Sequence, residues 1–480
     1  MPTPADGTTG ILVGGESLVS DIPLPVEDPA TCDVVRTVHA ADEGLVNAAV
    51  DAAADALDRW SGTPVRSRQK ALTILADALG SRCEELARIL TLEQGKPLAE
   101  ARREVLNAAR TYRYYAGLTI APEPVRDDER GTVTAHMEHV GVCALVLPWN
   151  YPVSIMSWKL APCLLAGNTA VIKPAMTTPL ADWMVAAMAD KLLPPGTVNV
   201  VSGGDEVGRA LVAHPAVDKV SLTGSVATGR SVAEVAGRGL KHISLELGGN
   251  DPAVVFGSVR PERVASRLLR AAMRNAGQVC VAVKRLYLHE DVADAVLERM
   301  VAEARVMVVG PGLDPATQMG PLNNRPQLER VRSLVEQAQD EGGEVVCGGI
   351  VPDVSGHERG LFYAPTLVTG LEENGALVAQ EQFGPVLPVQ TFSDEDEVLA
   401  HVNCTEHGLG TSVWDSDIEH AKTFAARIRA GTVWVNAHAG IDEAAPFGGM
   451  GISGVGREHG RWGLESYVQW KTLNVSRDPV

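Results

Sequence analysis

Short apolar runs alternate with stretches of helical periodicity from Val140 onward. This alternation predicts a parallel β-sheet with helices on both of its faces, and therefore an α/β fold. Ligands of such sheets bind at the carboxyl ends of the strands, so the residues that follow each run are candidate site residues. The apolar runs are residues 142–147, 170–173, 198–201, 220–222 and 243–245, and helices such as 180–192 lie between them.

The part of the chain before Val140 predicts a layer of helices that a sheet must cover. In the first helix, Val46, Val50, Ala53 and Leu57 share one face, and acidic residues lie off that face. The expected helices are 42–60, 66–79, 82–92 and 98–115.

Residues 120–139 differ in composition from the helices before them. A charged turn there joins an edge-like strand with little apolar content. Such a hairpin either meets another subunit or stays solvated on a monomer. The sequence around it is compatible with both.

Composition limits the class of protein. The 480 residues are 45% apolar and 21% charged, which is enough for large cores and predicts two or three domains. A net charge of -18 argues against nucleic acid or an anionic membrane surface as a partner. The seven cysteines are scattered without a C-x-x-C pair, so we expect neither disulfides nor a metal site.

Residues 1–15 contain no Lys or Arg and no long apolar run, so they do not resemble a signal peptide. No apolar run elsewhere reaches a membrane-spanning length. We therefore expect a soluble protein in the reducing cytoplasm.

The run at 220–222 is followed by Thr223-Gly224-Ser225, and Gly229 lies further on. Ser225 and the free amides of the following helix favour an anionic group such as a pyrophosphate. The spacing is not that of the G-x-G-x-x-G fingerprint. A literal match to that fingerprint occurs at 449–454, but no strand precedes it, so we interpret it as a turn-rich loop.

Two further residues could carry chemistry. An amphipathic helix, about 264–275, ends before Gly277 and then presents Cys280. A thiol with a pKa of roughly 8.5 becomes a nucleophile only where its surroundings favour the thiolate, and otherwise it is a small buried hydrophobe. Glu246 follows an apolar run, and partial burial would make it a better general base; an exposed strand-end glutamate is the alternative.

Seven short motifs occur in one order along the chain, and in that order they resemble the aldehyde dehydrogenase superfamily from near the N-terminus to the last residues. The resemblance implies an α/β fold with two parallel-sheet domains, a Rossmann-like cofactor domain and a catalytic thiol domain, plus a small β oligomerisation hairpin. The motifs are Pro148-Trp149-Asn150, Lys173-Pro174, Gly224-Ser225 with Gly229, Glu246-Leu247-Gly248-Gly249, Gly277-Gln278-Val279-Cys280, EQFGP at 381–385, and PFGG at 446–449 with SGVGRE at 453–458.

The resemblance also implies catalytic roles. The Cys280 thiolate attacks the aldehyde carbon, the Asn150 amide and the Cys280 backbone N–H hold the oxyanion, and Glu246 activates the water that hydrolyses the thioester. Lys159 and Glu458 match positions linked to proton transfer and support of the site, although each could also be an ordinary solvated charge.

The implied cofactor is NAD, with NADP not excluded. Lys173 and Glu381 would hydrogen-bond the two riboses. Many NAD-preferring relatives have an acidic residue where this chain has Met176, which neither binds the ribose hydroxyls nor repels a 2′-phosphate. Gly451 stands where a Lys is common. The implied cofactor-binding residues are Trp149, Lys173, Met176, Gly224, Ser225, Gly229, Leu247, Glu381 and Phe383.

The expected substrate pocket favours an apolar or aromatic aldehyde, because two aromatic residues and two valines flank the thiol and the Asn150 loop. His438 is either a substrate contact or a hydrogen-bonded structural residue. The pocket residues are Tyr151, Trp158, Val279, Val281 and His438. An enzyme that passes the acyl group to coenzyme A is disfavoured by Glu246, and a non-catalytic homologue by the intact set of Cys280, Glu246 and Asn150.

The resemblance divides the chain into parts and implies a homodimer or homotetramer. The cofactor domain comprises 1–119 and 140–247, the catalytic domain 248–440, the oligomerisation segments 120–139 and 467–476, and an active-site-proximal C-terminal segment 441–466.

Overall fold

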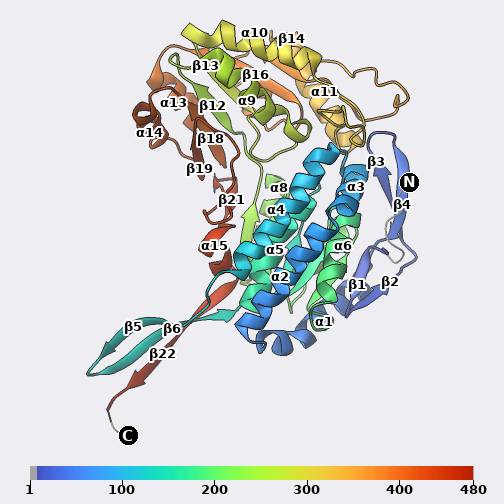
Figure 1. Cartoon of the computed structure of the whole chain (residues 1–480), viewed down its shortest axis with the longest axis vertical. Coiled ribbons are helices and arrows are strands. Elements are labelled where there is room, and N and C mark those ends of the chain that lie inside the picture. Colours follow the sequence, from blue (N-terminus) through green and yellow to red (C-terminus); the bar gives the residue numbers. More distant parts are fainter. Residues whose placement is uncertain (1–7, 479–480) are drawn as a thin grey trace.

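The computed structural model describes residues 8–478 and contains two large, mostly parallel β-sheets (Figure 1). The first sheet has the strand order β2-β1-β9-β8-β7-β10-β11-β21. Its five central strands are parallel and almost fully buried, which explains their continuous apolar runs. They are β7 (Val142–Val146), β8 (Thr169–Lys173), β9 (Val198–Val201), β10 (Lys219–Thr223) and β11 (His242–Glu246), and the antiparallel edges are β1 (Ile11–Val13), β2 (Glu16–Leu18) and β21 (Gly454–Val455).

Helices pack on this sheet and on one another, as the apolar periodicity predicts. The central helix α5 (Pro152–Ala166) is buried on nearly every side, because α4 covers the face that the sheet leaves free. The others are α1 (Glu43–Ser61), α2 (Val65–Ser81), α3 (Cys83–Gln94), α4 (Leu98–Ala116), α6 (Pro179–Asp190), α7 (Asp205–Ala213) and α8 (Val226–Arg238).

The second sheet has the order β14-β15-β16-β13-β12-β18-β19, and only β14 runs antiparallel. Its strands are β12 (Pro252–Val255), β13 (Arg285–His289), β14 (Glu344–Cys347), β15 (Thr366–Thr369), β16 (Val386–Phe392), β18 (Gly410–Trp414) and β19 (Thr432–Val435). Helices α9 (Pro261–Met273), α10 (Glu290–Val306), α11 (Arg325–Asp340), α12 (Ala376–Ala379), α13 (Glu395–Asn403) and α14 (Ile418–Ala425) accompany it. The predicted α/β fold class is confirmed, whereas the domain boundaries stay a prediction.

A three-stranded antiparallel sheet projects from the body of the molecule (Figure 1). The tail strand β22 (Val468–Ser476) pairs along its whole length with β6 (Gly131–His139), and β6 pairs with β5 (Glu123–Asp128). The hairpin and the tail of one chain, the two segments that the resemblance assigns to oligomerisation, therefore form a single sheet.

The structure corrects the prediction that residues 449–454 form a turn-rich loop. Strand β20 (Met450–Gly451) pairs with β17 (His407–Gly408), and β21 extends the first sheet beside β11. The edge of β11 offers unpaired backbone groups, so this short segment completes the sheet. A separate two-stranded sheet joins β3 (Pro23–Asp28) and β4 (Asp33–His39).

The expectation of no signal peptide concerns residues 1–15, of which 1–7 lie outside the described residues. Between residues 8 and 478, no helix is both long enough and apolar enough to cross a membrane.

Candidate active site

A strained turn after α9 presents the thiol. Asn275 and Ala276 have φ values of 51° and 53°, and Gly277 follows with a φ of 71°. A Cβ on Gly277 would lie 2.0 Å from the carbonyl oxygen of Gly384, so only glycine fits there. Non-glycine residues in the left-handed region cost roughly 1 kcal/mol or more each, and such strain clusters at functional sites.

Hydrogen bonds join this turn to the Asn150 loop. Asn275 Nδ2 donates to the Asn150 carbonyl oxygen at 3.1 Å, and Asn150 Nδ2 donates to the Gln278 carbonyl oxygen at 3.0 Å. Lys96 Nζ also donates to the Asn150 carbonyl oxygen at 2.7 Å and forms a buried ion pair with Glu104. The two loops are therefore held at a fixed separation.

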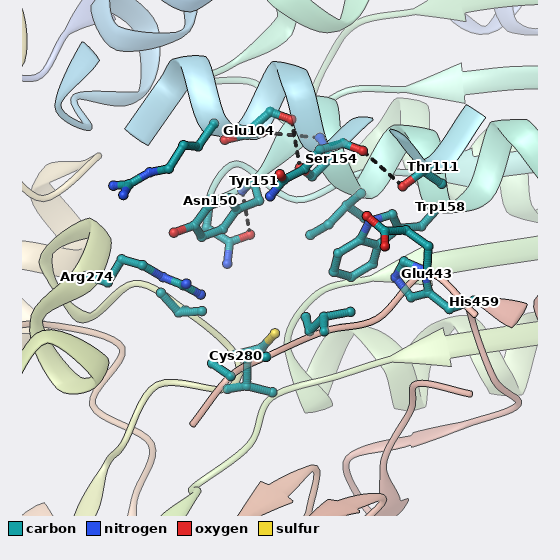
Figure 2. Close-up of a pocket in the computed structure, with 18 of the residues that line it drawn as sticks. Glu104, Thr111, Asn150, Tyr151, Ser154, Trp158, Arg274, Cys280, Glu443 and His459 are labelled. Carbon is teal, nitrogen blue, oxygen red and sulfur yellow. Dashed lines mark hydrogen bonds between the residues drawn. The ribbon is translucent and has the colours of Figure 1, made fainter. Parts of the chain in front are cut away.

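Cys280 lies where two cavities meet. Figure 2 shows Asn150 and Tyr151 on one side of the first cavity and Cys280 opposite them. Both Cys280 and Asn150 line this cavity of about 340 Å³, and both also line a second cavity of about 600 Å³. A group bound in either cavity can reach the sulfur.

The first cavity contains four of the five predicted substrate-pocket residues, namely Tyr151, Trp158, Val279 and Val281. The fifth, His438, is absent from the walls of both cavities. Its ring nitrogens are 2.8 Å from Ser412 Oγ and 2.8 Å from the Val281 carbonyl oxygen, so it braces the thiol loop instead of facing substrate. Charged residues that the sequence did not single out also line this cavity: Glu100, Arg103, Glu104, Arg110, Arg274 and Glu443.

The second cavity contains most of the predicted cofactor residues. Trp149 and Phe383 make an edge-to-face contact at 5.3 Å on its wall. Ser225 caps α8, since its Oγ accepts from the Thr228 backbone N–H at 3.1 Å. The predicted residues on its wall are Trp149, Gly224, Ser225, Leu247, Glu381 and Phe383.

The other three predicted cofactor residues lie beyond this wall. Lys173 Nζ donates to the Pro174 carbonyl oxygen at 3.1 Å. Burial lowers the pKa of Lys173, and nearby Asp205 and Glu206 act in the opposite direction. Met176 is 46% exposed, and Gly229 is buried within α8.

Glu246 ends β11 and is buried, so the exposed alternative is wrong. Among the described residues, neither of its carboxylate oxygens has a hydrogen-bond partner. Burial raises the pKa of Glu246 well above its ordinary value, and the charge of Glu458 raises it further. The side chain lines neither cavity described above.

Lys159 and Glu458 are also buried, which contradicts the alternative of solvated surface charges. Their ion pair measures 2.5 Å, and Lys159 Nζ donates to Ser221 Oγ at 3.2 Å. This pair lies close enough to Glu246 to act on its pKa, with Lys159 lowering it. The three residues form one buried cluster of ionisable side chains.

Burial raises the pKa of the Cys280 thiol to about 12. Lys284 lowers this pKa, whereas Asp251, Glu381 and Glu246 raise it. At neutral pH the thiol therefore carries its proton in this structure and needs an acceptor before it can act as a nucleophile.

Lys284 is a further residue near the thiol that the sequence did not single out. Its Nζ donates to the Cys280 carbonyl oxygen and forms an ion pair with Glu381 at 3.2 Å. The available signal was a lysine directly after the apolar Val281-Ala282-Val283 and only four residues from the thiol.

The aldehyde dehydrogenase family matches residues 19–473. Phenylacetaldehyde dehydrogenase of Pseudomonas fluorescens is 39% identical over 482 residues, which cover 97% of this chain and 95% of that protein. Betaine aldehyde dehydrogenase of Brucella anthropi is 37% identical over 461 residues, 95% of each chain. The structure of betaine aldehyde dehydrogenase from Staphylococcus aureus in complex with NAD+ has a TM-score of 0.97 and 31% identity, covering 99% of this chain and 97% of the other. With this agreement over nearly its whole length, the chain belongs to the aldehyde dehydrogenase family, whose members oxidise aldehydes with NAD(P).

Proposed function

We propose that this enzyme converts its aldehyde into a free carboxylic acid through a covalent adduct on Cys280. The observation that carries the proposal is a single thiol at the meeting point of two cavities. One cavity is the size of a small aldehyde site, and the other has the helix end and aromatic walls that suit a dinucleotide.

In the first step Glu246 takes the Cys280 proton and passes it on to solvent, the sulfur bonds to the carbonyl carbon, and the carbonyl π electrons move to oxygen. Asn150 Nδ2 donates one of its two N–H groups to the Gln278 carbonyl oxygen. The second N–H of this amide remains for the oxyanion. The Cys280 backbone N–H is the proposed second donor. Each such donor stabilises the transition state by about 3–4 kcal/mol.

Trp149, Glu381 and Phe383 line the second cavity and would hold a nicotinamide there, which when bound would accept the hydride from the adduct carbon and so leave a thioester on Cys280. Glu246 then takes a proton from water as the water oxygen attacks the thioester carbon, and the sulfur leaves as thiolate. A carboxyl group with a raised pKa suits this proton transfer near neutral pH. Because Glu246 lines neither cavity, its side chain must turn toward the sulfur for this step.

The residues present fit NAD. The α8 N-terminus with Ser225 favours a pyrophosphate, and Trp149, Glu381 and Phe383 would surround the nicotinamide end. Asp205 and Glu206 lie near enough to act on Lys173, and their charges would oppose a 2′-phosphate there. Met176 adds no carboxylate of its own, so NADP stays a second cofactor to test.

We propose an apolar or aromatic aldehyde as substrate. Tyr151, Ile155, Trp158 and Val279 form an apolar wall next to the sulfur. Trp158 is in turn supported by Phe447 through an edge contact at 5.6 Å. The similarity to a phenylacetaldehyde dehydrogenase agrees with this class of substrate.

The test is a panel of aromatic, aliphatic and charged aldehydes with NAD and with NADP, followed by formation of the reduced cofactor. Each reaction is run with and without coenzyme A, and the product is identified by mass spectrometry. A free acid in both supports hydrolysis. An acyl-coenzyme A product would assign the coenzyme A-acylating reaction instead, and no reduced cofactor across the panel would favour a non-catalytic homologue.

We propose a homodimer or homotetramer built through the projecting sheet. Strand β22 exposes Trp470, Leu473 and Val475 at 45–50%, and an exposed apolar edge strand can pair with another chain. Trp470→Glu should lower the mass measured by light scattering after gel filtration, while Leu106→Glu, at an exposed apolar position on α4, should not.

The seven free cysteines support a cytoplasmic location.

A further inference from the structure

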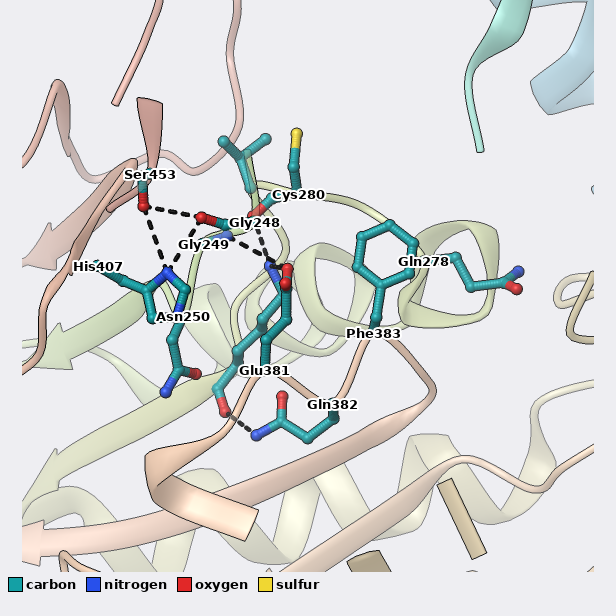
Figure 3. Close-up of polar contacts among 12 residues, drawn as sticks. Gly248, Gly249, Asn250, Gln278, Cys280, Glu381, Gln382, Phe383, His407 and Ser453 are labelled. Carbon is teal, nitrogen blue, oxygen red and sulfur yellow. Dashed lines mark hydrogen bonds and ion pairs between the residues drawn. The ribbon is translucent and has the colours of Figure 1, made fainter. Parts of the chain in front are cut away.

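A buried lysine lies behind the thiol loop and contacts residues of both the thiol and the cofactor cavity. The Lys284 side chain is 2% exposed. Its Nζ donates to the Cys280 carbonyl oxygen and pairs with Glu381 Oε1 at 3.2 Å. Figure 3 shows Glu381 and Phe383 next to the Cys280 loop, and the Phe383 ring centre is 5.9 Å from Lys284 Nζ.

A buried ammonium group is costly unless other groups compensate it. Here the compensating groups are a carbonyl oxygen, a carboxylate and an aromatic face, and all three belong to residues that line the second cavity. A lysine with only a packing function would not need partners that all belong to residues of the site. Its contacts therefore point to a role in the site.

The backbone holds Lys284 firmly in this place. Its N–H donates to the Asp251 carbonyl oxygen at 2.9 Å, and β13 begins at the next residue, paired with β12. A second hydrogen bond holds Glu381, since the same Oε1 that pairs with Lys284 also accepts from the Gly249 N–H at 3.2 Å. A Cβ on Gly248 would lie 2.1 Å from Glu381 Oε2, so this close approach requires glycine.

We propose that Lys284 is a positioning residue that holds the Cys280 loop and Glu381 in register and supplies the positive charge that favours the thiolate. This inference rests on the proposed role of Cys280 as the nucleophile. It adds the residue whose charge offsets part of the effect of burial on the pKa of the thiol.

The charges around the sulfur give the proposal its direction. Asp251, Glu381 and Glu246 all disfavour the thiolate, and Lys284 opposes them. Arg274 and Tyr151 face the sulfur from the substrate side, and His407 and His438 lie within the field of Lys284. Loss of the ammonium leaves the three carboxylates opposed only from the substrate side, so the thiolate should become rarer.

The experiment measures alkylation of Cys280 by iodoacetamide as a function of pH, using mass spectrometry of the Cys280 peptide, so that the other cysteines do not interfere. In Lys284→Met the alkylation profile should move upward by about one pH unit or more, which is a roughly tenfold lower rate on its rising limb. Lys284→Gln can still donate a hydrogen bond but has no charge, so it should show the same shift. Lys284→Arg should restore most of the wild-type profile.

Lys219 provides a matched control. It is also fully buried, its Nζ donates to Ser244 Oγ at 2.7 Å, and it begins β10, near Lys159 and Glu458 but not among the charges that act on the Cys280 thiol. Lys219→Met should therefore leave the alkylation profile unchanged. A cofactor KM that rises in Lys284→Met and not in Lys219→Met would report the loss of support for Glu381.

If the neutral Lys284 variants do not fold, Glu381→Gln tests the same charge balance with the opposite sign. Removing the carboxylate should move the alkylation profile downward. An unchanged profile in folded Lys284→Met and Lys284→Gln, or in Glu381→Gln when those do not fold, would overturn the inference. The proposed function fails separately, if Cys280→Ser retains turnover.

Discussion

Replacement of Asn150 by alanine tests the proposed oxyanion site most directly. The variant removes the amide whose second N–H is free to face the adduct. The loss of one such donor costs about 3–4 kcal/mol of transition-state stabilisation, which corresponds to a decrease in kcat of roughly 10²- to 10³-fold. Substrate binding should change much less, because the charge develops only in the transition state.

The same variant has a structural effect that must be separated from catalysis. Two hydrogen bonds disappear: Asn150 Nδ2 to the Gln278 carbonyl oxygen, and the Tyr151 N–H to Asn150 Oδ1, each 3.0 Å. Asn275 Nδ2 remains 3.5 Å from the Gln278 carbonyl oxygen and offers partial replacement. We therefore expect a loss of stability of about 1–2 kcal/mol.

Asn199→Ala is the matched control. Asn199 is fully buried on β9, donates to the Gly196 carbonyl oxygen at 2.7 Å and accepts from the Gly14 N–H at 2.9 Å. It should lower the urea midpoint comparably and leave kcat unchanged. If folded Asn150→Ala keeps more than a tenth of the wild-type kcat, Asn150 does not hold the oxyanion.

Three further changes test other parts of the site. Cys280→Ser should abolish turnover while cofactor binding measured by calorimetry persists, because serine is a far weaker nucleophile here; surviving turnover would place the nucleophile elsewhere. Met176→Glu should raise the ratio of kcat/KM with NAD to kcat/KM with NADP roughly tenfold, since a carboxylate repels a nearby 2′-phosphate by roughly 1 kcal/mol or more; an unchanged ratio would show that this position does not contact the ribose. Burial raises the pKa of Asp251 from 3.8 to about 8, so the folded state keeps a proton that the unfolded state releases, and stability should fall as pH rises between these values. Asp251→Asn should flatten that fall in urea midpoints measured across the window, and an equal slope in the variant would contradict the assignment.

The first sheet and the helices that precede it could be predicted from the sequence, because strands buried on both faces are continuous apolar runs and half-buried helices repeat apolar residues along one face. Strands β7 to β11 are continuous apolar runs for this reason. The segment at Met450–Val455 leaves no such record. Its strands are two residues long and pair through the backbone alone, so side-chain patterns cannot reveal them.

Side-chain partners across long sequence separations were also beyond prediction. His438 contacts Ser412 and Val281, and this choice between a structural and a substrate role depends on geometry alone. Lys284 looks like an ordinary charge at the start of a strand until the fold brings Glu381 beside it, 97 residues further along the chain. The positive φ values of Asn275 and Ala276 could not be predicted, because neither residue is a glycine.

In the proposed mechanism, the raised pKa of Glu246 would favour proton transfer from the thiol as well as from water. The cost of moving a proton from Cys280 to a carboxylate is set by the difference between their pKa values, at about 1.4 kcal/mol per unit. With the thiol at about 12 and an ordinary glutamate near 4.3, this transfer would cost about 10 kcal/mol. Burial of Glu246 narrows that gap from below, and the pKa of about 12 for the thiol already includes the lowering by Lys284, without which the gap would be wider. Burial of Glu246 raises the pKa of the proton acceptor, and the Lys284 ammonium lowers the pKa of the proton donor. Both effects depend on burial, because water would screen the charges and solvate the carboxylate.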